Sequence, residues 1–218
     1  MKKINLKWIK AIIFDMDWTM INNMSTHKKA WKEFCFRKGF ILSDDDFKQK
    51  ISGFKNDQIF LNLFGDNLSQ SEITEYADEK ESVYRELYKP IIKETSGLTE
   101  IIQKIKKLNI KLAIATTAPK ANRDFVLKEL HLENYFDIIL WEEDVKKWKP
   151  DPEIYLKTAE LLDVRPWECL VFEDSPAGLQ SGKSAGMKVI WLTTSHSIED
   201  LLSADLIIED FSKLEISE

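Results

Sequence analysis

Glycine is scarce in this chain of 218 residues. The sequence has 7 Gly, whereas average usage predicts roughly 15 for this length, and Trp is as frequent as Gly, also at 7. Cysteine is rarer still, with only Cys35 and Cys169, and both stand among apolar neighbours. This usage excludes a disulfide scaffold and predicts two small buried thiols in a reducing compartment.

Long apolar runs and an excess of basic residues are also missing. No segment is apolar enough to span a bilayer, and the N-terminus lacks the apolar centre of a signal peptide. The 31 Lys and Arg are scattered and outnumbered by 37 Asp and Glu, for a net charge of −6. We therefore expect a cytoplasmic monomer that binds neither nucleic acid nor membranes, with enough chain to bury a sizeable core.

The chain does contain an alternation of strand and helix patterns. A short apolar run over residues 11–14 predicts a buried strand, whereas apolar residues recur at helical spacing from about 20 to 88. Further strands are predicted over 111–115, 137–140, 169–172, 188–192 and 206–208, and further helices around 101–105 and over 124–131, 151–162, 176–185 and 197–203. This order predicts an α/β fold, a doubly wound, mostly parallel sheet, in which residues 1–19 and 91–218 form the core and residues 20–90 an inserted helical cap.

Four short polar segments adjoin the predicted strands. They are Phe14-Asp15-Met16-Asp17-Trp18-Thr19, Ala115-Thr116-Thr117, Lys149-Pro150-Asp151-Pro152 and Phe172-Glu173-Asp174-Ser175. Each segment alone is typical of a turn or a helix start. Because ligands of open parallel sheets bind beyond the carboxyl ends of the strands, the topology brings these groups to one edge.

The residue types at this edge suit phosphate chemistry. Asp15 and Asp17 are two apart at a strand end, so both can point to one side, and two such carboxylates repel unless a cation intervenes. With Asp174 they make a hard oxygen site suited to Mg²⁺. Such an ion lets a carboxylate attack an anionic phosphate, and Lys149 and Thr116 can bind the phosphate oxygens.

These motifs together resemble the haloacid dehalogenase superfamily, and within it the β-phosphoglucomutase-like group with a helical cap. The resemblance covers essentially the whole chain and implies a Rossmann-like core. It implies that Asp15 is the nucleophile and Asp17 the general acid and base. Thr116 and Lys149 then hold the transferring phosphoryl group. The implied metal ligands for Mg²⁺ are Asp15, the Asp17 carbonyl and Asp174, and Glu173 supports this metal site.

The resemblance also implies substrate-binding residues. In the predicted cap these are His27, just after the first hinge, Lys80, and Lys55 and Asn56 in a specificity loop beginning at Gly53. Thr117, on the core, completes the set. The mutases of the group have an Arg about where Asn56 stands, so this chain departs from their pattern. Lys55 can replace that Arg as a point charge but not as a bidentate ligand.

The expected function is Mg²⁺-dependent phosphoryl transfer through an aspartyl phosphate. The expected substrate is a small phosphorylated metabolite, a hexose phosphate, handled by a mutase or a sugar phosphatase. Two alternatives stay open. One is a phosphatase for another substrate, including pyrophosphate. The other is a weakly active protein that binds phosphometabolites, because Trp18 places a large ring beside Asp17.

Several tryptophans stand where the family pattern often has glycine. Trp18 and Trp148 flank motif residues, and Trp8, Trp141 and Trp191 occupy positions of a similar kind. One hypothesis is that some of these codons are UGA and that the source organism reads UGA as glycine. If Trp18 is native and its position requires φ > 0, backbone strain adds to the crowding by its ring.

Overall fold

The computed structural model describes residues 1–51, 54, 56–65, 67–194 and 203–217. The chain divides into two compact units. The first comprises Met1–Asn22 with Ile92–Glu218, and the second comprises Asn23–Ile91.

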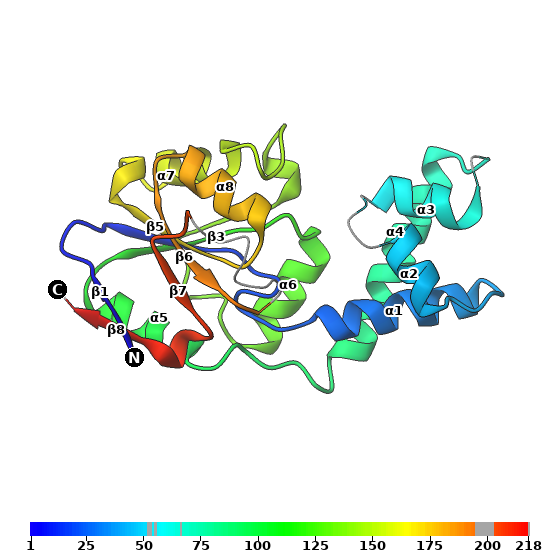
Figure 1. Cartoon of the computed structure of the whole chain (residues 1–218), viewed down its shortest axis with the longest axis horizontal. Coiled ribbons are helices and arrows are strands. Elements are labelled where there is room, and N and C mark those ends of the chain that lie inside the picture. Colours follow the sequence, from blue (N-terminus) through cyan, green and yellow to red (C-terminus); the bar gives the residue numbers. More distant parts are fainter. Residues whose placement is uncertain (52–53, 55, 66, 195–202, 218) are drawn as a thin grey trace. The chain divides into compact units, whose positions relative to one another are not determined.

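The first unit is built on a six-stranded sheet whose paired strands all run parallel (Figure 1). Its spatial order is β4-β3-β2-β5-β6-β7. The strands are β2 (Ala11–Phe14), β3 (Lys111–Ala115), β4 (Ile138–Leu140), β5 (Cys169–Glu173), β6 (Lys188–Leu192) and β7 (Leu206–Ile208). The chain winds outward in both directions from the central β2, and every residue of β2 and β5 is buried. The predicted doubly wound α/β fold is confirmed.

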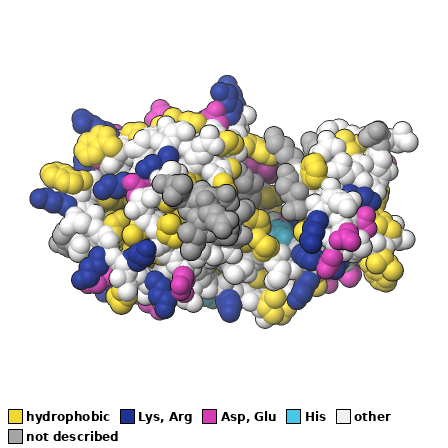
Figure 2. All heavy atoms as spheres, in the orientation of Figure 1, with side chains coloured by type: hydrophobic (Ala, Val, Ile, Leu, Met, Phe, Trp, Pro, Cys, Tyr) yellow, Lys and Arg dark blue, Asp and Glu magenta, His cyan; other side chains and the backbone are white. Residues whose placement is uncertain are grey.

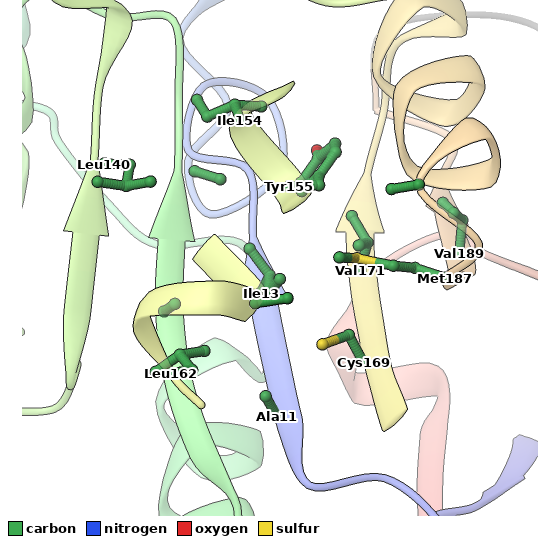
Figure 3. Close-up of a cluster of buried hydrophobic side chains, with 14 of the residues drawn as sticks. Ala11, Ile13, Leu140, Ile154, Tyr155, Leu162, Cys169, Val171, Met187 and Val189 are labelled. Carbon is green, nitrogen blue, oxygen red and sulfur yellow. The ribbon is translucent and has the colours of Figure 1, made fainter. Parts of the chain in front are cut away.

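Helices cover both faces of this sheet. They are α5 (Leu98–Lys107), α6 (Lys120–Glu129), α7 (Glu153–Leu161) and α8 (Pro176–Ser184), with short 3₁₀ turns at Glu142–Asp144, Pro166–Glu168 and Phe211–Lys213. Figure 1 shows α7 and α8 on one face and α5 on the other. Figure 3 shows the buried cluster beneath α7, in which Ile13 of β2, Val171 of β5 and Tyr155 of α7 come together. This packing fixes α7 against the strands that carry the polar segments.

A second, two-stranded parallel sheet joins the chain ends. It pairs β1 (Lys2–Asn5) with β8 (Leu214–Ser217), and Lys3 forms an ion pair with Glu215 at 3.3 Å. Neither strand is predicted by the sequence pattern. Both are short, and β1 is largely exposed and polar, so neither carries the apolar run that marks a buried strand.

Element boundaries differ from the predictions by a few residues. The helix predicted over 124–131 is α6 and begins at Lys120, directly after Pro119. The helix predicted over 151–162 is α7 and begins at Glu153, because Pro152 stands at the N-cap. The helix predicted over 197–203 falls mostly on residues that the structure does not describe.

The second unit contains α1 (Met24–Arg37), α2 (Asp44–Lys50), α3 (Asn56–Phe64) and α4 (Gln70–Tyr88). Its described elements are all helices, as the apolar spacing predicts. Aromatic rings form much of its interior, with Trp31, Phe34 and Phe60 in mutual contact. A capping box between Ser69 and Glu72 starts α4.

The surface carries charges of both signs. On the face that Figure 2 shows, Lys and Arg side chains lie among Asp and Glu side chains on each unit. None of the described helices is both long enough and apolar enough to cross a membrane.

Candidate active site

The carboxyl edge of the six-stranded sheet holds the predicted site. Phe14 of β2 is in register with Ile114 of β3 and with Phe172 of β5. The residue after each therefore stands at the same level, which places Asp15 between Ala115 and Glu173. Asp15 is only 8% exposed, and its backbone N–H donates to the Phe172 carbonyl at 3.0 Å.

Lys149 reaches this edge from the loop before α7. Its Nζ donates to Asp15 Oδ1 at 2.6 Å, to Glu173 Oε1 at 2.7 Å and to the Ala115 carbonyl at 3.0 Å. Burial alone would lower the pKa of Lys149, but the carboxylates of Asp15 and Glu173 hold it well above its usual value. The side chain is therefore a fixed, buried ammonium beside the predicted nucleophile. Its peptide bond to Pro150 is cis.

Glu173 is the anchor of the cluster. Its Oε1 accepts from Lys149 and from the Tyr155 hydroxyl at 2.9 Å, and its Oε2 accepts from the backbone N–H groups of Asp174 at 2.9 Å and Ser175 at 3.0 Å. Burial raises the pKa of Glu173, but Lys149 and these hydrogen bonds outweigh it and keep the pKa below its usual value. An ionised carboxylate that accepts from every side suits a structural anchor for Lys149 and for the start of α8.

Gly178 makes this anchor possible. A Cβ atom built on Gly178 would lie 1.7 Å from Glu173 Oε1 and 1.9 Å from its carboxyl carbon. The first turn of α8 therefore wraps closely around the carboxylate, and Ser175 caps that turn by accepting from the Gly178 N–H at 3.0 Å.

Three carboxylates at this edge fit a divalent cation. Asp15, Glu173 and Asp174 each offer an oxygen within 4.8 Å of the others, and all three are buried. Thr19 donates its hydroxyl to Asp174 Oδ1 at 3.1 Å and so holds that carboxylate in place. Burial raises the pKa of Asp15 well above its usual range, Lys149 opposes this, and the charges of Glu173 and Asp174 add to it. A hard cation would favour the ionised form of Asp15, so the residues present fit Mg²⁺.

Asp17 and Trp18 follow Asp15 in a tight turn. Asp17 is partly buried, and a β-bridge joins its backbone to Ile21. Trp18 has φ = +63°, a left-handed conformation that glycine adopts readily and that is unfavourable for a large side chain such as tryptophan. Its carbonyl accepts a hydrogen bond from the Thr194 hydroxyl. The backbone strain expected for a tryptophan at positive φ is therefore present at Trp18.

Thr116 and Thr117 follow β3 at the same edge. Thr116 is 1% exposed, and its hydroxyl oxygen accepts from the Ala118 N–H at 3.1 Å. That bond orients the hydroxyl and leaves its hydrogen able to donate to a ligand oxygen. Thr117 is exposed.

The second unit brings His27 and Lys80 together. Lys80 is 4% exposed, and its Nζ lies 3.1 Å from His27 Nδ1, 2.7 Å from Glu81 Oε1 and 5.0 Å from the centre of the Trp31 ring. The His27 ring stacks on Tyr84 with centroids 4.0 Å apart. Burial, followed by the charge of Lys80, lowers the pKa of His27 to about 3.

The chemistry of this cluster assigns the His27 tautomer. The Lys80 ammonium can only donate, so Nδ1 accepts and the neutral ring carries its proton on Nε2. That nitrogen lies 3.3 Å from the Asn23 amide, and a rotated amide would present its oxygen to the ring. Of the other predicted substrate residues, Asn56 is the first residue of α3, and Lys55 lies outside the described residues.

Comparison with known proteins identifies the family. A family model described as haloacid dehalogenase-like hydrolase matches residues 12–192. The chain belongs to this family. It is 31% identical over 192 residues to a phosphorylated carbohydrates phosphatase of Thermotoga maritima, with 88% of each chain covered.

Two further matches refine the relationship. The chain is 29% identical to a beta-phosphoglucomutase of Bacillus subtilis, with 94% of this chain and 92% of the relative covered. The crystal structure of a haloacid dehalogenase hydrolase of family IA, variant 3, from Entamoeba histolytica superposes with a TM-score of 0.86. That structure is 33% identical in sequence, with 95% of this chain and 96% of the other covered. The predicted β-phosphoglucomutase-like group within the superfamily is confirmed.

Sequence reasoning missed several residues that contact the predicted site residues, among them Thr19, Tyr155 and Glu81. Thr19 stands inside a quoted motif, so its neighbours could have drawn attention to it. In the sequence, Tyr155 looks like an ordinary residue on the apolar face of a helix, and Glu81 looks like one of several acidic residues in a charged helix. Only the three-dimensional contacts distinguish these two.

Proposed function

We propose that this protein is a Mg²⁺-dependent phosphatase for a phosphorylated sugar and works through an aspartyl phosphate. The contact of Lys149 with both Asp15 and Glu173 carries the proposal, because a buried ammonium next to a buried carboxylate suits nucleophilic attack on an anionic phosphate. The names of the phosphorylated carbohydrates phosphatase and the beta-phosphoglucomutase support this substrate class.

In the first chemical step Asp15 attacks the phosphorus. A bond forms between its carboxylate oxygen and phosphorus while the bond to the sugar oxygen breaks, and Asp17 gives its proton to that leaving oxygen. Lys149 and the Thr116 hydroxyl bind the phosphoryl oxygens as their charge redistributes. In the second step Asp17 takes a proton from water, whose oxygen bonds to phosphorus, and Asp15 leaves as a free carboxylate.

The carboxylates of Asp15 and Asp174 and the carbonyl of Asp17 would hold the Mg²⁺. A bound Mg²⁺ neutralises phosphate charge, so that an anionic carboxylate can approach the phosphorus. Glu173 supports this set by fixing Lys149 and the N–H groups around Asp174.

Residues 20–90 act as the cap in this proposal. The cap excludes water from the first step and contributes His27, Lys80, Lys55 and Asn56 to substrate binding, with Thr117 on the core side. Asn56 favours a phosphatase over a mutase, because an amide cannot give a second phosphate group the bidentate grip of Arg. A β-phosphoglucomutase-like mutase is the second candidate, favoured by the beta-phosphoglucomutase relative.

One assay separates these readings. The protein is given Mg²⁺, β-glucose 1-phosphate and a trace of glucose 1,6-bisphosphate, and glucose 6-phosphate and free phosphate are measured together. Free phosphate alone supports the phosphatase, whereas glucose 6-phosphate that forms faster than phosphate supports the mutase. The Asp15→Asn variant and an EDTA-treated sample are the controls, and neither should form glucose 6-phosphate or free phosphate.

A negative result in that assay has a defined sequel. A panel of other phosphate esters and pyrophosphate follows under the same conditions. If no compound in the panel releases phosphate with Mg²⁺, the phosphatase proposal is overturned. The alternative based on Trp18, a weakly active protein that binds phosphometabolites, then replaces it.

A further inference from the structure

Tyr155 has no part in the mechanism above, yet its hydroxyl reaches the catalytic cluster. It donates to Glu173 Oε1 at 2.9 Å, and the same oxygen accepts from Lys149 Nζ at 2.7 Å. Lys149 in turn lies 2.6 Å from Asp15 Oδ1. A single carboxylate oxygen therefore connects the Tyr155 hydroxyl to the ammonium beside the nucleophile.

We propose that Tyr155 is a positioning residue for phosphoryl transfer, an inference that rests on the proposed function. Its hydroxyl fixes the orientation of the Glu173 carboxylate and thereby keeps Lys149 beside Asp15. Tyr155 acts through Glu173 and Lys149 and does not itself touch the substrate.

The two oxygens of Glu173 have separate partners. Oε2 faces the start of α8, where it accepts from the Asp174 and Ser175 N–H groups, while Oε1 divides its lone pairs between Tyr155 and Lys149. Without the Tyr155 hydroxyl, Oε1 attracts Lys149 more strongly and the carboxylate can turn toward it. The ammonium then lies closer to Glu173 and farther from the phosphoryl oxygens, and such small displacements are costly in catalysis.

The surroundings of Tyr155 make it a rigid support. Its side chain is 0% exposed and packs in the cluster of Figure 3 with Ile13 and Val171, on the side toward which the strand arrows point. Burial and the nearby Glu173 charge raise the pKa of Tyr155 well above its usual value, so the phenol keeps its proton and remains a donor. Lys149 Nζ also lies 5.0 Å from the centre of the Tyr155 ring.

The decisive variant is Tyr155→Phe, which deletes the hydroxyl and keeps the ring. We expect kcat to fall about 10-fold with little change in KM, because the lost hydrogen bond to a charged group acts on the transition state. Inhibition by orthovanadate, which mimics the five-coordinate phosphorus, should weaken by a similar factor. The matched control is Ile154→Val, a change at a buried neighbour on the same helix whose apolar side chain cannot hydrogen-bond to Glu173.

A purely structural role predicts a different result. In that case both variants melt at lower temperature, but well below melting they keep wild-type kcat and the wild-type inhibition constant for orthovanadate. A Tyr155→Phe enzyme whose kcat stays within twofold of wild type overturns the proposal. Inactive wild-type protein is a separate result, because it overturns the proposed function rather than the role of Tyr155.

Two further measurements keep the test decisive. Tyr155→Met also lacks the hydroxyl, fills the space with a flexible thioether and replaces the Phe variant if that variant does not fold. Glu173→Gln is then combined with the Tyr155 variant in a double-mutant cycle. If Tyr155 acts through Glu173, the double variant loses little more kcat than Glu173→Gln alone, whereas multiplied losses overturn the proposal.

Discussion

Lys149 Nζ lies 2.6 Å from Asp15 Oδ1, and each of these side chains is about nine-tenths buried. Two such charges are stable away from water only as partners, because an isolated buried charge carries a large desolvation penalty. Glu173, also buried, gives Lys149 a second anion at 2.7 Å. The contacts on which the proposed phosphoryl transfer depends therefore also bear on the stability of the core.

Replacing Lys149 by Met tests both consequences. We expect phosphatase activity to fall by about 10²-fold or more, since a fixed charge for the phosphoryl oxygens is gone. The free energy of unfolding should fall by about 3 kcal/mol at pH 7.5, because Asp15 and Glu173 then face each other without a cation. Urea denaturation and phosphate release measure the two effects.

The control for this variant is Lys147→Met in the same loop. The Lys147 side chain is 73% exposed and forms an ion pair with Asp151 at 3.4 Å, so its loss should change activity less than twofold. The Lys149→Met deficit should shrink at pH 5, where the remaining carboxylates bind protons more readily. An equal deficit at both pH values would contradict the assigned ion pairs.

Gly178 provides an independent test of the Glu173 anchor. Alanine normally stabilises a helix by up to about 1 kcal/mol relative to glycine. Here its Cβ would lie 1.7 Å from Glu173 Oε1, so we expect Gly178→Ala to destabilise the protein by about 2 kcal/mol and to reduce kcat sharply. Thermal melting and steady-state kinetics measure both quantities.

The matched control is Gly182→Ala on the same helix. The atoms nearest to a Cβ atom at Gly182 would be a Val189 methyl group at 2.8 Å and then the Val171 side chain at 3.7 Å. This variant should therefore change the melting temperature while it keeps kcat. If Gly178→Ala also changes the melting temperature but keeps kcat, activity does not depend on the observed position of Glu173.

Much of the sheet and the polar residues at its carboxyl edge could be predicted from the sequence, because buried parallel strands are apolar runs with polar residues at their carboxyl ends. That pattern predicted β2, β3 and β5, and with them the level at which Asp15 and Glu173 stand, with Thr116 one residue farther along the chain after β3. The β1–β8 pair could not be predicted in this way, since an exposed, polar strand has no apolar pattern.

Contacts made by single side chains could not be predicted from the sequence for a different reason. Whether Tyr155 turns its hydroxyl toward Glu173 depends on the register of α7 against the sheet, which no local pattern encodes. The left-handed backbone of Trp18 could be stated only as a condition, because a tryptophan is not expected at positive φ.

Trp18 yields a comparison of two variants. Trp18→Gly and Trp18→Ala both remove the ring, but only glycine adopts φ = +63° without strain. We expect Trp18→Gly to be about 1 kcal/mol more stable than Trp18→Ala in urea denaturation. If both variants gain activity equally, the ring obstructs the site, and if only the Gly variant gains, the backbone is responsible.

The same pair of changes at Trp148 is the control. Trp148 is 42% exposed and is not among the residues with positive φ, so the Ala variant should be at least as stable as the Gly variant there. This contrast also bears on the glycine-codon hypothesis. Glycine suits position 18, whereas Trp191 is 0% exposed in the core cluster, where glycine would leave a large cavity. The hypothesis therefore fits some of these tryptophans better than others.

His27 predicts a pH dependence of stability. Its pKa is about 3 in the folded protein, well below the 6.5 of an unfolded histidine. Between pH 6.5 and pH 3 the unfolded chain therefore binds a proton on His27 that the folded chain does not. The contribution of His27 to stability is fully present above pH 6.5 and is lost as pH falls toward 3. At pH 5 the expected loss from this residue is about 2 kcal/mol relative to pH 7.5.

The difference between two proteins isolates this effect from all other titrating groups. Urea denaturation at pH 5 and pH 7.5 gives the change in the free energy of unfolding for the wild type and for His27→Gln. Between these pH values the Gln variant should lose about 2 kcal/mol less than the wild type. Gln cannot take up a proton but still offers an oxygen to Lys80, so the contact at 3.1 Å has a substitute. Lys29→Gln, an exposed change on the same helix, should keep the wild-type slope. Equal slopes for the wild type and His27→Gln would mean that His27 accepts a proton in the folded protein. The Lys80 ammonium could then not donate to Nδ1, and the cluster of His27, Lys80 and Glu81 would need a different arrangement.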